Sequence, residues 1–421
     1  MKHVILGAGP AGVIAAETIR KHAPNDAIVI VGDEAEPPYS RMAIPYLLMG
    51  NVGEEGTHLR HERGHFDKLR IDLRRGRATA VDTAQRTVAL ADGSNLPFDT
   101  LLIATGSSPV RPPIPGIANA GVHPCWTLAD ARAIAQLATE GARVLQMGTG
   151  FIGCIIMEAL AARGVHLTVV EMGDRMVPRM MGPTAGGMIK EWCESQGVRV
   201  FTGTRVEAIE PHAPLKVRLS NGQQLEADLV ISAVGVKPNI GFLENSDVKC
   251  LLGVLTDEHM QTNVPGIYAA GDCAEAFDKA SGKTIVSAIQ PNAADQAYVA
   301  AMNMAGQQAQ LKGVTQINVL DTLGLISASF GDWQGVAGGD HVELTDRAAG
   351  RHLSLQFAGD VMVGCNSIGW TDHVGVMRGL VEGRVPLGEW KHELLRDPTQ
   401  LMQAYLSRAQ AQDQRALLRV Q

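Results

Sequence analysis

The sequence predicts an α/β protein in which one strand–turn–helix unit occurs twice, followed by a separate α+β domain. Two stretches, residues 3–20 and 144–163, each combine a short apolar run, a glycine-rich turn and a run with helical spacing. This pattern is typical of parallel sheets covered by helices. Beyond Gly306 the pattern changes to short strands between residues 317 and 365, and then to helices near 372–382 and 398–410. We therefore expect two α/β domains and an α+β C-terminal domain.

The first glycine-rich turn directly follows the apolar run 3–6. Gly7 permits a tight turn, Gly9 lets the backbone approach a pyrophosphate, and Gly12 lets the helix pack closely on the strand. A second apolar run, 27–31, ends just before Asp33 and Glu34. Asp33 lies 33 − 12 = 21 residues after Gly12, the distance at which a carboxylate binds the ribose of a dinucleotide. The stretch therefore predicts a dinucleotide-binding domain.

The same pattern starts afresh at residue 144. The strand 144–147 is followed by a turn that contains Gly148, Gly150 and Gly153, and the strand 165–171 ends in Glu171, 171 − 153 = 18 residues after the last glycine. Residues 228–235 also resemble residues 99–106. Two copies of the unit imply two bound dinucleotides. We expect two Rossmann-like, three-layer dinucleotide-binding domains, one inserted in the other.

A third informative stretch, residues 264–274, is an apolar strand that ends in Gly271 and Asp272. Ligands of open α/β sheets bind at the carboxyl ends of the strands. Asp272 is therefore a candidate for binding a polyol chain. The small residues of the expected helix 293–304 suit close packing against a cofactor.

The proline-rich tract 109–115 marks a crossing between domains. The predicted division assigns residues 1–112 and 244–310 to the first dinucleotide-binding domain and residues 113–243 to the second. Residues 311–421 form the predicted α+β interface domain.

The composition argues against several classes of protein. A net charge of −7 disfavours nucleic acid as the main partner. No apolar stretch reaches the roughly 18 residues of a membrane span, and the first strand begins too early for a signal peptide, so we expect a cytoplasmic protein. The six cysteines form no C-x-x-C pair, which favours buried thiols over disulfides or a metal site.

A basic stretch lies in this acidic chain. Residues 58–77 contain seven Lys or Arg and three Asp or Glu, a local balance of 7 − 3 = +4. A solvated basic face is the simpler interpretation, and a docking site for an acidic electron-transfer protein is the alternative. His58, His61 and His65 have polar, irregular flanks, so we expect surface histidines and not metal ligands.

Four motifs carry a resemblance to a known family. They are the doubled glycine turns, Ile103-Ala104-Thr105-Gly106, Ala270-Gly271-Asp272-Cys273, and Pro38-Tyr39-Ser40-Arg41. The chain resembles the pyridine nucleotide-dependent FAD oxidoreductases. Within them it is most similar to NADH-dependent ferredoxin and rubredoxin reductases and to the flavoprotein part of assimilatory nitrite reductase. The resemblance is strong over residues 1–310 and loose beyond.

The resemblance implies roles for individual residues. The first turn would hold the FAD pyrophosphate, with Asp33 or Glu34 on the ribose and Arg41 at the phosphates. The backbone of Ala78 would contact the adenine, and Asp272 would bind the ribityl chain. The remaining residues implied to bind FAD are Gly7, Gly9, Pro10, Ala11, Gly12, Thr105, Gly106, Gly271 and Asn292. Those implied to bind the nicotinamide dinucleotide are Gly148, Gly150, Phe151, Ile152, Gly153, Glu171 and Gly235.

Glu171 indicates which nicotinamide dinucleotide binds. A carboxylate accepts hydrogen bonds from the ribose 2′-hydroxyl and repels a 2′-phosphate, so NADH is favoured over NADPH. Arg175 would weaken this preference if it turned toward the phosphate.

Three departures from the family pattern concern the chemistry. Residues 34–50 contain no redox cysteine, and Met42 stands about where the single cysteine of some members would be. Ile155 replaces a glutamate near the nicotinamide, and Gln290 stands where many ferredoxin reductases have a tryptophan over the flavin. A thiol relay is therefore not expected.

The resemblance implies hydride transfer from NADH to the flavin N5, with no catalytic side chain beyond the flavin. Electrons would then pass to a small redox protein such as ferredoxin or rubredoxin, or to a partner redox subunit. An NADH oxidase that uses oxygen, and a flavoprotein subunit or NADH-responsive binding module of a larger complex, are the alternatives. The sequence leaves a homodimer open.

Overall fold

The structure is a computed structural model, and it describes residues 1–279, 281–314 and 317–408. The chain divides into two compact units. The first contains Met1–Val110, Trp126–Leu128 and the described residues from Val236 onward to residue 314. The second contains Arg111–Cys125, Ala129–Gly235 and the described residues from 317 to 408.

A five-stranded parallel sheet forms the centre of the first unit, in the order β19-β7-β1-β2-β3. Its strands are almost continuously apolar, as expected where both faces of a sheet are covered. Their bounds are β1 (Lys2–Leu6), β2 (Ala27–Gly32), β3 (Ile71–Arg75), β7 (Thr100–Ile103) and β19 (Ile267–Ala269).

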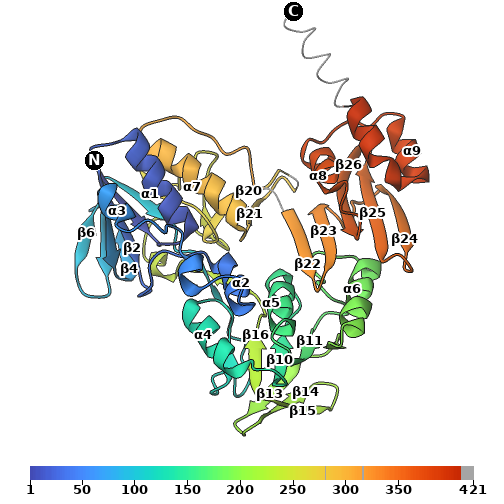
Figure 1. Cartoon of the computed structure of the whole chain (residues 1–421). Helices are drawn as coiled ribbons and strands as arrows, with labels where there is room; N and C mark the ends of the chain where they lie inside the picture. Colours follow the sequence, from blue (N-terminus) through green and yellow to red (C-terminus); the bar gives the residue numbers. More distant parts are fainter. Residues whose placement is uncertain (280, 315–316, 409–421) are drawn as a thin grey trace, which may run out of the picture. The chain divides into compact units, whose positions relative to one another are not determined.

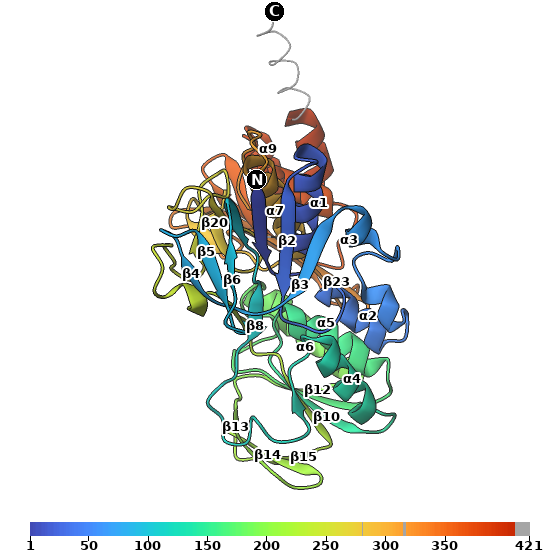
Figure 2. The ribbon, with the colours of Figure 1, turned by 90° about the vertical axis from the view of Figure 1, so that its left-hand side faces the viewer.

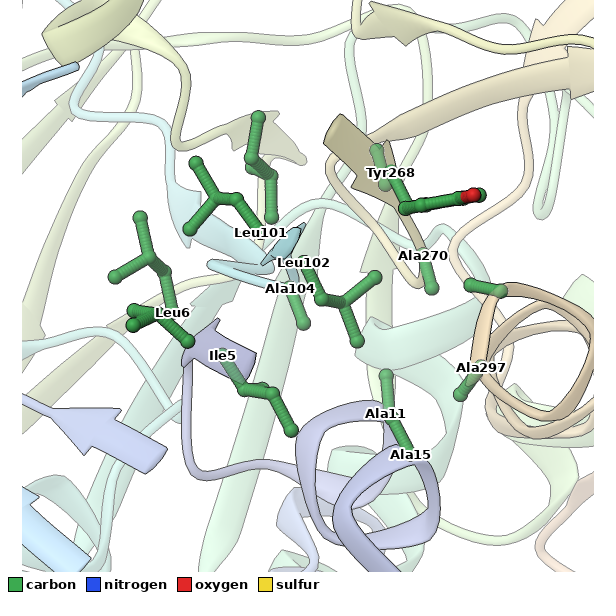
Figure 3. Packing of buried hydrophobic residues seen from close by; sticks show 14 of the residues in the cluster. Ile5, Leu6, Ala11, Ala15, Leu101, Leu102, Ala104, Tyr268, Ala270 and Ala297 are labelled. Atoms are coloured by element: carbon green, nitrogen blue, oxygen red, sulfur yellow. The ribbon is translucent and has the colours of Figure 1, made fainter. Parts of the chain in front are cut away.

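Two helices, α1 (Pro10–His22) and α7 (Gln290–Met304), lie side by side in both views (Figures 1 and 2). Figure 3 shows Ala11 and Ala15 of α1 and Ala297 of α7 facing Ile5 of β1 and Leu102 of β7. Small residues let these helices approach closely. The predicted helix 293–304 is confirmed, and it begins three residues earlier.

A small antiparallel sheet shares this core through Val81, Val88 and Leu96 (Figure 2). Its strands are β4 (Ala78–Asp82), β5 (Thr87–Leu90) and β6 (Asn95–Pro97). Shorter strands complete the unit: β8 (Ser107–Pro109), β17 (Val236–Pro238), β18 (Val254–Leu255), β20 (Ala274–Phe277) and β21 (Thr284–Val286). Its short helices are η1 (Arg41–Ala43), α2 (Ile44–Leu48), η2 (Glu54–Thr57), α3 (His65–Lys68) and η3 (Gly241–Leu243).

The second unit repeats the plan with the sheet order β12-β11-β10-β16-β9. The parallel strands are β9 (Val122–His123), β10 (Arg143–Met147), β11 (His166–Val170), β12 (Arg199–Phe201) and β16 (Leu229–Ser232). The helices are α4 (Leu128–Leu137), α5 (Phe151–Ala161) and α6 (Pro183–Ser195), and the small sheet is β13 (Val206–Glu210), β14 (Leu215–Leu219) and β15 (Gln224–Ala227). The predicted repeat of one unit is therefore present in the fold.

The sequence predicts strands in the stretches 198–206 and 225–232, and the structure divides each stretch between two strands. The stretch 198–206 is divided between β12 and β13 because Gly203, with φ +61°, turns the chain between them. The stretch 225–232 is divided between β15 and β16 at Asp228, whose carboxylate accepts hydrogen bonds from Arg143 on β10.

The C-terminal part of the second unit is an antiparallel sheet in the order β22-β23-β26-β25-β24. Its strands are β22 (Ile317–Thr322), β23 (Leu325–Gly331), β24 (Asp340–Asp346), β25 (Arg351–Ala358) and β26 (Val361–Ile368). The helices α8 (Val374–Glu382) and α9 (Trp390–Arg396) and the turn η4 (Pro398–Gln400) pack on it.

The α+β character predicted beyond Gly306 is confirmed, although the sequence missed α9. Of the predicted helix 398–410, residues 401–408 are helical and the last two lie outside the described residues. Among the described residues, no helix combines the length and apolar character needed to cross a membrane.

Candidate functional site

The turn between β1 and α1 shows why three glycines are needed. Gly7 has φ +118°, and a Cβ on it would lie 2.0 Å from the carbonyl oxygen of Ala104. A Cβ on Gly12 would lie 1.9 Å from the carbonyl oxygen of Gly7. In contrast, a Cβ on Gly9 would meet nothing within 4 Å. Packing therefore requires the outer two glycines, while the middle one leaves open space at the N-terminus of α1, where an anion is favoured.

The turn between β10 and α5 repeats this arrangement position by position. Gly148 has φ +91°, and its Cβ would lie 2.5 Å from the carbonyl oxygen of Ala233. A Cβ on Gly153 would lie 2.6 Å from the carbonyl oxygen of Gly148, and one on Gly150 would meet nothing within 4 Å. Gly9 and Gly150 are both the extended N-cap residues of their helices. Each unit thus has one cradle that fits a pyrophosphate, which we call the first and the second cradle.

The first residues of the two helices also correspond. Pro10 is at the first position of α1, where its missing N–H costs nothing, and Ala11 is buried beside it. Phe151 and Ile152 occupy the same positions in α5 and are half-buried.

The two acids that follow β2, Asp33 and Glu34, have different partners in the structure. Glu34 accepts hydrogen bonds from the Tyr39 hydroxyl at 2.6 Å and from Arg41 at 2.6 Å. Asp33 is half-exposed and pairs with Arg77 at 3.0 Å. Arg77 directly precedes Ala78, the first residue of β4, so Ala78 is the chain neighbour of the residue that pairs with Asp33. The Asp33 side chain is also the more exposed of the two, 49% against 30% for Glu34, so Asp33 is the better ribose candidate.

Arg41 is held in place by its neighbours. Its guanidinium donates to the Tyr39 hydroxyl at 3.0 Å and to the carbonyl oxygen of Trp126 at 2.7 Å. It also lies over both aromatic rings, 5.5 Å from the Tyr39 centroid and 5.4 Å from the Trp126 centroid. Three of the five N–H donors of Arg41 thus bind Glu34, Tyr39 and Trp126. Among the residues that the structure describes, the other two donors have no hydrogen-bond partner, so they could bind a phosphate.

Asp272 is a largely buried carboxylate at the carboxyl end of β19. Burial raises its pKa above the ordinary value of 3.8, while the hydrogen bond from Ser107 and the charge of Arg41 lower it. The Ser107 hydroxyl donates to Asp272 at 2.8 Å. The preceding residue, Gly271, has φ +81° and donates its N–H to Gln296 Oε1 at 2.7 Å. A hydroxyl-rich chain would supply donors to this carboxylate.

The remaining candidates of the first unit surround the same strand ends. Thr105 donates to the carbonyl oxygen of Asn239 at 2.8 Å. Gly106 has φ +64°, and a Cβ on it would meet nothing within 4 Å. Asn292 is buried in α7 and donates to the Ser287 hydroxyl at 2.7 Å. The structure therefore brings the predicted FAD residues to one edge of the sheet, with Asn292 directed inward.

Glu171 lies directly after β11 beside the second cradle. Its Oε2 accepts hydrogen bonds from the Thr149 backbone N–H at 2.8 Å and the Thr149 hydroxyl at 2.9 Å. Its Oε1 accepts a hydrogen bond from the Gly173 N–H at 2.7 Å. Gly235, with φ +114°, follows β16 and would meet nothing within 4 Å if it carried a Cβ. The sequence placed Glu171 correctly beside the turn but did not reveal its bonds to Thr149.

Arg175 does not point freely into solvent. Its guanidinium donates to the carbonyl oxygen of Met181 at 2.8 Å and to Asp174 at 2.7 Å. Only 18% of its side chain is exposed. It is therefore anchored by its own loop.

Comparison with known proteins decides the family. The family model for pyridine nucleotide-disulphide oxidoreductases matches residues 1–303. The chain belongs to this family. The epsilon subunit of the NADH-dependent phenylglyoxylate dehydrogenase of Aromatoleum evansii is 33% identical over 94% of this chain and 95% of that protein. An NADH oxidase of Methanocaldococcus jannaschii is 32% identical over 74% of this chain and 71% of that protein.

A solved structure has the same fold over nearly the whole chain. Putidaredoxin reductase, in its covalent complex with putidaredoxin, has a TM-score of 0.88 and 25% identity, and the match covers 97% of this chain and 99% of that one. Members of the family use FAD and NADH, and this chain is an NADH-dependent flavoprotein reductase. The family and fold predicted from the sequence are confirmed.

The thiols of this chain are poorly suited to the disulphide chemistry in the family's name. All six cysteines are free, and burial raises the pKa of Cys154 and Cys193 to about 12. Met42 is exposed on η1, and Gln290 accepts a hydrogen bond from Ser40 at 2.8 Å. Ile155 is half-buried on α5. Within the described residues, no group of His, Cys, Asp and Glu could hold a metal ion.

Many charges of the basic stretch 58–77 are paired within the first unit. Arg60 and His65 both contact Glu17 of α1, at 2.5 and 2.7 Å. Arg74 donates to the Ser94 hydroxyl at 2.6 Å, Lys68 pairs with Glu62, and Arg77 pairs with Asp33. This pairing favours a structural role for the stretch over a docking role. It also places His65 within hydrogen-bond distance of Glu17 with 19% of its side chain exposed, where the sequence predicted a surface histidine.

Proposed function

We propose that the chain takes electrons from NADH in the second cradle through FAD in the first and delivers them to a partner redox subunit or a small redox protein. The observation that supports it most is the matched pair of cradles, each with an open middle glycine and an acid at the ribose distance. FAD, when bound, accepts the hydride and releases its electrons to the acceptor.

The first cradle supplies binding and orientation. The N-terminus of α1 and the remaining donors of Arg41 would hold the FAD pyrophosphate, and Asp33 the adenine-side ribose. Asp272 would accept hydrogen bonds from the ribityl chain. Thr105, Gly106 and Gly271 would line the flavin.

The second cradle would bind NADH through Gly148, Gly150 and Gly153, with Glu171 on the ribose. A 2′-phosphate would meet the charge of Glu171, and Arg175 is anchored to Met181 and not available to neutralise it. We therefore propose a preference for NADH over NADPH.

A thiol relay has little support in this chain. Residues 34–50 contain no cysteine, and burial raises the pKa of Cys125 and Cys365 to about 12, so the reactive thiolates are scarce at neutral pH. These buried thiols also support the proposed cytoplasmic location, where cysteines stay reduced.

A partner subunit is the acceptor we favour, because a relative that matches 94% of this chain and is matched over 95% of its own length is itself named as a subunit. The test is to purify the chain with its natural neighbours and to follow NADH-driven reduction of a copurified subunit, of ferredoxin and of rubredoxin. Ferricyanide reduction reports NADH oxidation without the acceptor. If oxygen consumption without any added protein accounts for all NADH turnover, the chain is an NADH oxidase instead.

A charge reversal tests the basic stretch separately. Arg75 is exposed on β3, and Arg74 is tied to Ser94. If the stretch docks an acidic protein, Arg75→Glu slows acceptor reduction at low salt and leaves ferricyanide reduction unchanged. If Arg75→Glu reduces the acceptor as fast as the wild-type protein does, the stretch does not dock the acceptor.

A further inference from the structure

The residue between the first two glycines of the second cradle is Thr149. It is fully buried, and its position in the turn corresponds to that of Ala8 in the first cradle. Its backbone N–H and its hydroxyl both donate to the same oxygen, Oε2 of Glu171, at 2.8 and 2.9 Å. A residue of the proposed phosphate-binding turn is therefore hydrogen-bonded directly to the proposed ribose-binding acid.

These bonds leave Glu171 little freedom. A carboxylate has about four lone-pair positions. Thr149 fills two of them on Oε2, and the Gly173 N–H fills one on Oε1. One position on Oε1 remains for a ligand hydroxyl, and its direction is fixed before the ligand binds.

Thr149 also fixes the loop that follows Glu171. The N–H of Val177 lies 3.2 Å from the Thr149 carbonyl oxygen and 3.4 Å from the Thr149 hydroxyl oxygen. Val177 has φ +49°, a left-handed conformation that is costly for a β-branched residue. Since Val177 is completely buried, its bonds to Thr149 help to hold the loop in this conformation.

The first cradle has no equivalent of this arrangement. Ala8 carries no hydroxyl, and Asp33 is half-exposed and pairs with Arg77 instead. A hydroxyl at this position is thus not needed to make the glycine turn itself.

We propose that Thr149 is a positioning residue that sets the preference of the chain for NADH, by holding Glu171 against the turn so that a 2′-phosphate cannot displace it. This inference rests on the proposed role of Glu171 in binding the ribose. Without the Thr149 hydroxyl, Glu171 keeps only the two hydrogen bonds from backbone N–H groups. The carboxylate is then held less firmly, so it yields more readily to a 2′-phosphate and binds the 2′-hydroxyl less well.

The test compares Thr149→Val and Thr149→Ala, which both lose the hydroxyl, with Thr149→Ser, which keeps it. We measure kcat and KM for NADH and NADPH with ferricyanide, together with bound FAD and the melting temperature. Without the hydroxyl, the KM for NADH rises by about 3- to 10-fold, the effect of one intramolecular hydrogen bond, and the ratio of kcat/KM for NADH to that for NADPH falls by a similar factor. The values of kcat and FAD content stay unchanged, and Thr149→Ser keeps the wild-type ratio.

Two further variants make each outcome decisive. Thr100→Val is the matched control, because it removes a buried hydroxyl that contacts His3 in the first unit, at the opposite end of β7 from the cradle. It leaves the NADH to NADPH ratio unchanged. Glu171→Ala tests the proposed function itself: if it leaves the KM for NADH unchanged, Glu171 does not bind the ribose and the proposed site fails.

If Glu171→Ala raises the KM for NADH but Thr149→Val and Thr149→Ala keep the wild-type nucleotide ratio, the inference about Thr149 is wrong and the proposed function stands. If neither of these Thr149 variants folds while Thr149→Ser does, the hydroxyl serves the fold and not the selectivity. That result also overturns the inference.

Discussion

The first and second cradles share a backbone design and differ in the acid beside it. In both, the outer glycines are packed against carbonyl oxygens and the middle glycine faces open space. Asp33 of the first cradle is 49% exposed, and its partner Arg77 is 73% exposed. Glu171 of the second cradle instead accepts three hydrogen bonds from Thr149 and Gly173.

This difference matches the tasks proposed for the two cradles. FAD would stay bound, and it would have the additional contacts of Arg41 and Asp272 to hold it. NADH would bind and leave in every turnover, so a single prearranged carboxylate would carry more of its recognition. The duplicated turn supplies phosphate binding in both units, and the residues around the acid supply the specialisation.

Substituting the third glycine of each cradle has the largest expected effect. A Cβ at Gly12 would lie 1.9 Å from the Gly7 carbonyl oxygen, so Gly12→Ala forces the helix off the strand and yields a destabilised protein without FAD. Gly153→Ala disturbs only the second unit, so the protein keeps its FAD and loses NADH binding. Absorption spectra and ferricyanide assays check both. If Gly12→Ala binds FAD and melts at the wild-type temperature, the first cradle does not need a glycine at this position, and the proposed FAD site is wrong.

Substituting the middle glycines separates binding from folding. Neither Gly9 nor Gly150 would place a Cβ within 4 Å of another atom, so alanine there changes the free energy of unfolding of the ligand-free protein by less than about 1 kcal/mol. A methyl group between backbone and pyrophosphate weakens the ligand by on the order of tenfold or more. Gly9→Ala lowers the affinity for FAD, and Gly150→Ala raises the KM for NADH. Urea unfolding of the apoprotein measures the free energy of unfolding, and titrations with FAD and NADH measure the affinities. If the affinities are unchanged, the two ligands do not bind at these glycines.

Removing the negative charge of Glu171 is expected to lower the stability of the folded protein, and removing that of Asp272 is expected to raise it. Glu171→Gln loses charge-assisted bonds from Thr149 and Gly173, which lowers stability by about 1–3 kcal/mol. Asp272→Asn removes a carboxyl whose pKa is raised by burial, and such a group destabilises the folded protein once it ionises. The apoprotein of Asp272→Asn is therefore more stable than wild type at neutral pH.

The pH dependence of the stability tests whether the ionised Asp272 carboxylate destabilises the folded protein. Below the ordinary value of 3.8 the carboxyl is protonated in both the folded and the unfolded chain, so the stability gained by Asp272→Asn disappears as the pH falls toward that value. Unfolding of the apoproteins across this range measures the difference. If Asp272→Asn is instead less stable than the wild-type protein at neutral pH, and this deficit shrinks as the pH falls, Asp272 is stabilised as the ionised form.

The smallest effect is expected from Arg77. Its pair with Asp33 is exposed, and such pairs contribute about 0–1 kcal/mol. Arg77→Gln therefore changes the melting temperature little and leaves the KM for NADH unchanged. A large loss of FAD affinity would show that the pair positions Asp33 as firmly as Thr149 positions Glu171.

The sequence predicted those features that depend on local patterns. The glycine turns, the strands before them and the place of Glu171 depend on spacing and turn chemistry within a few dozen residues. The residues that hold the acids were missed, because Thr149 and Glu171 meet only after β10 and β11 have paired. Trp126 lies in the predicted second domain by sequence, but its contact with Arg41 belongs to the first unit.

The errors in secondary structure also have physical causes. Gly203 and Asp228 interrupt apolar runs that look continuous, and their turns depend on tertiary contacts such as the Arg143–Asp228 pair. The polar sequence of α9 gives little periodic signal, and its burial through Leu394 against the C-terminal sheet becomes visible only in the fold.

Anaerobic reduction of the purified protein by NADH, followed in a stopped-flow spectrometer, tests most directly whether the two cradles bind FAD and NADH as proposed. The wild-type protein should be yellow with stoichiometric FAD, and NADH should bleach the flavin far faster than NADPH at the same concentration. A colourless protein that cannot be reconstituted with FAD, or a flavin that NADH leaves oxidised for minutes, would contradict the account.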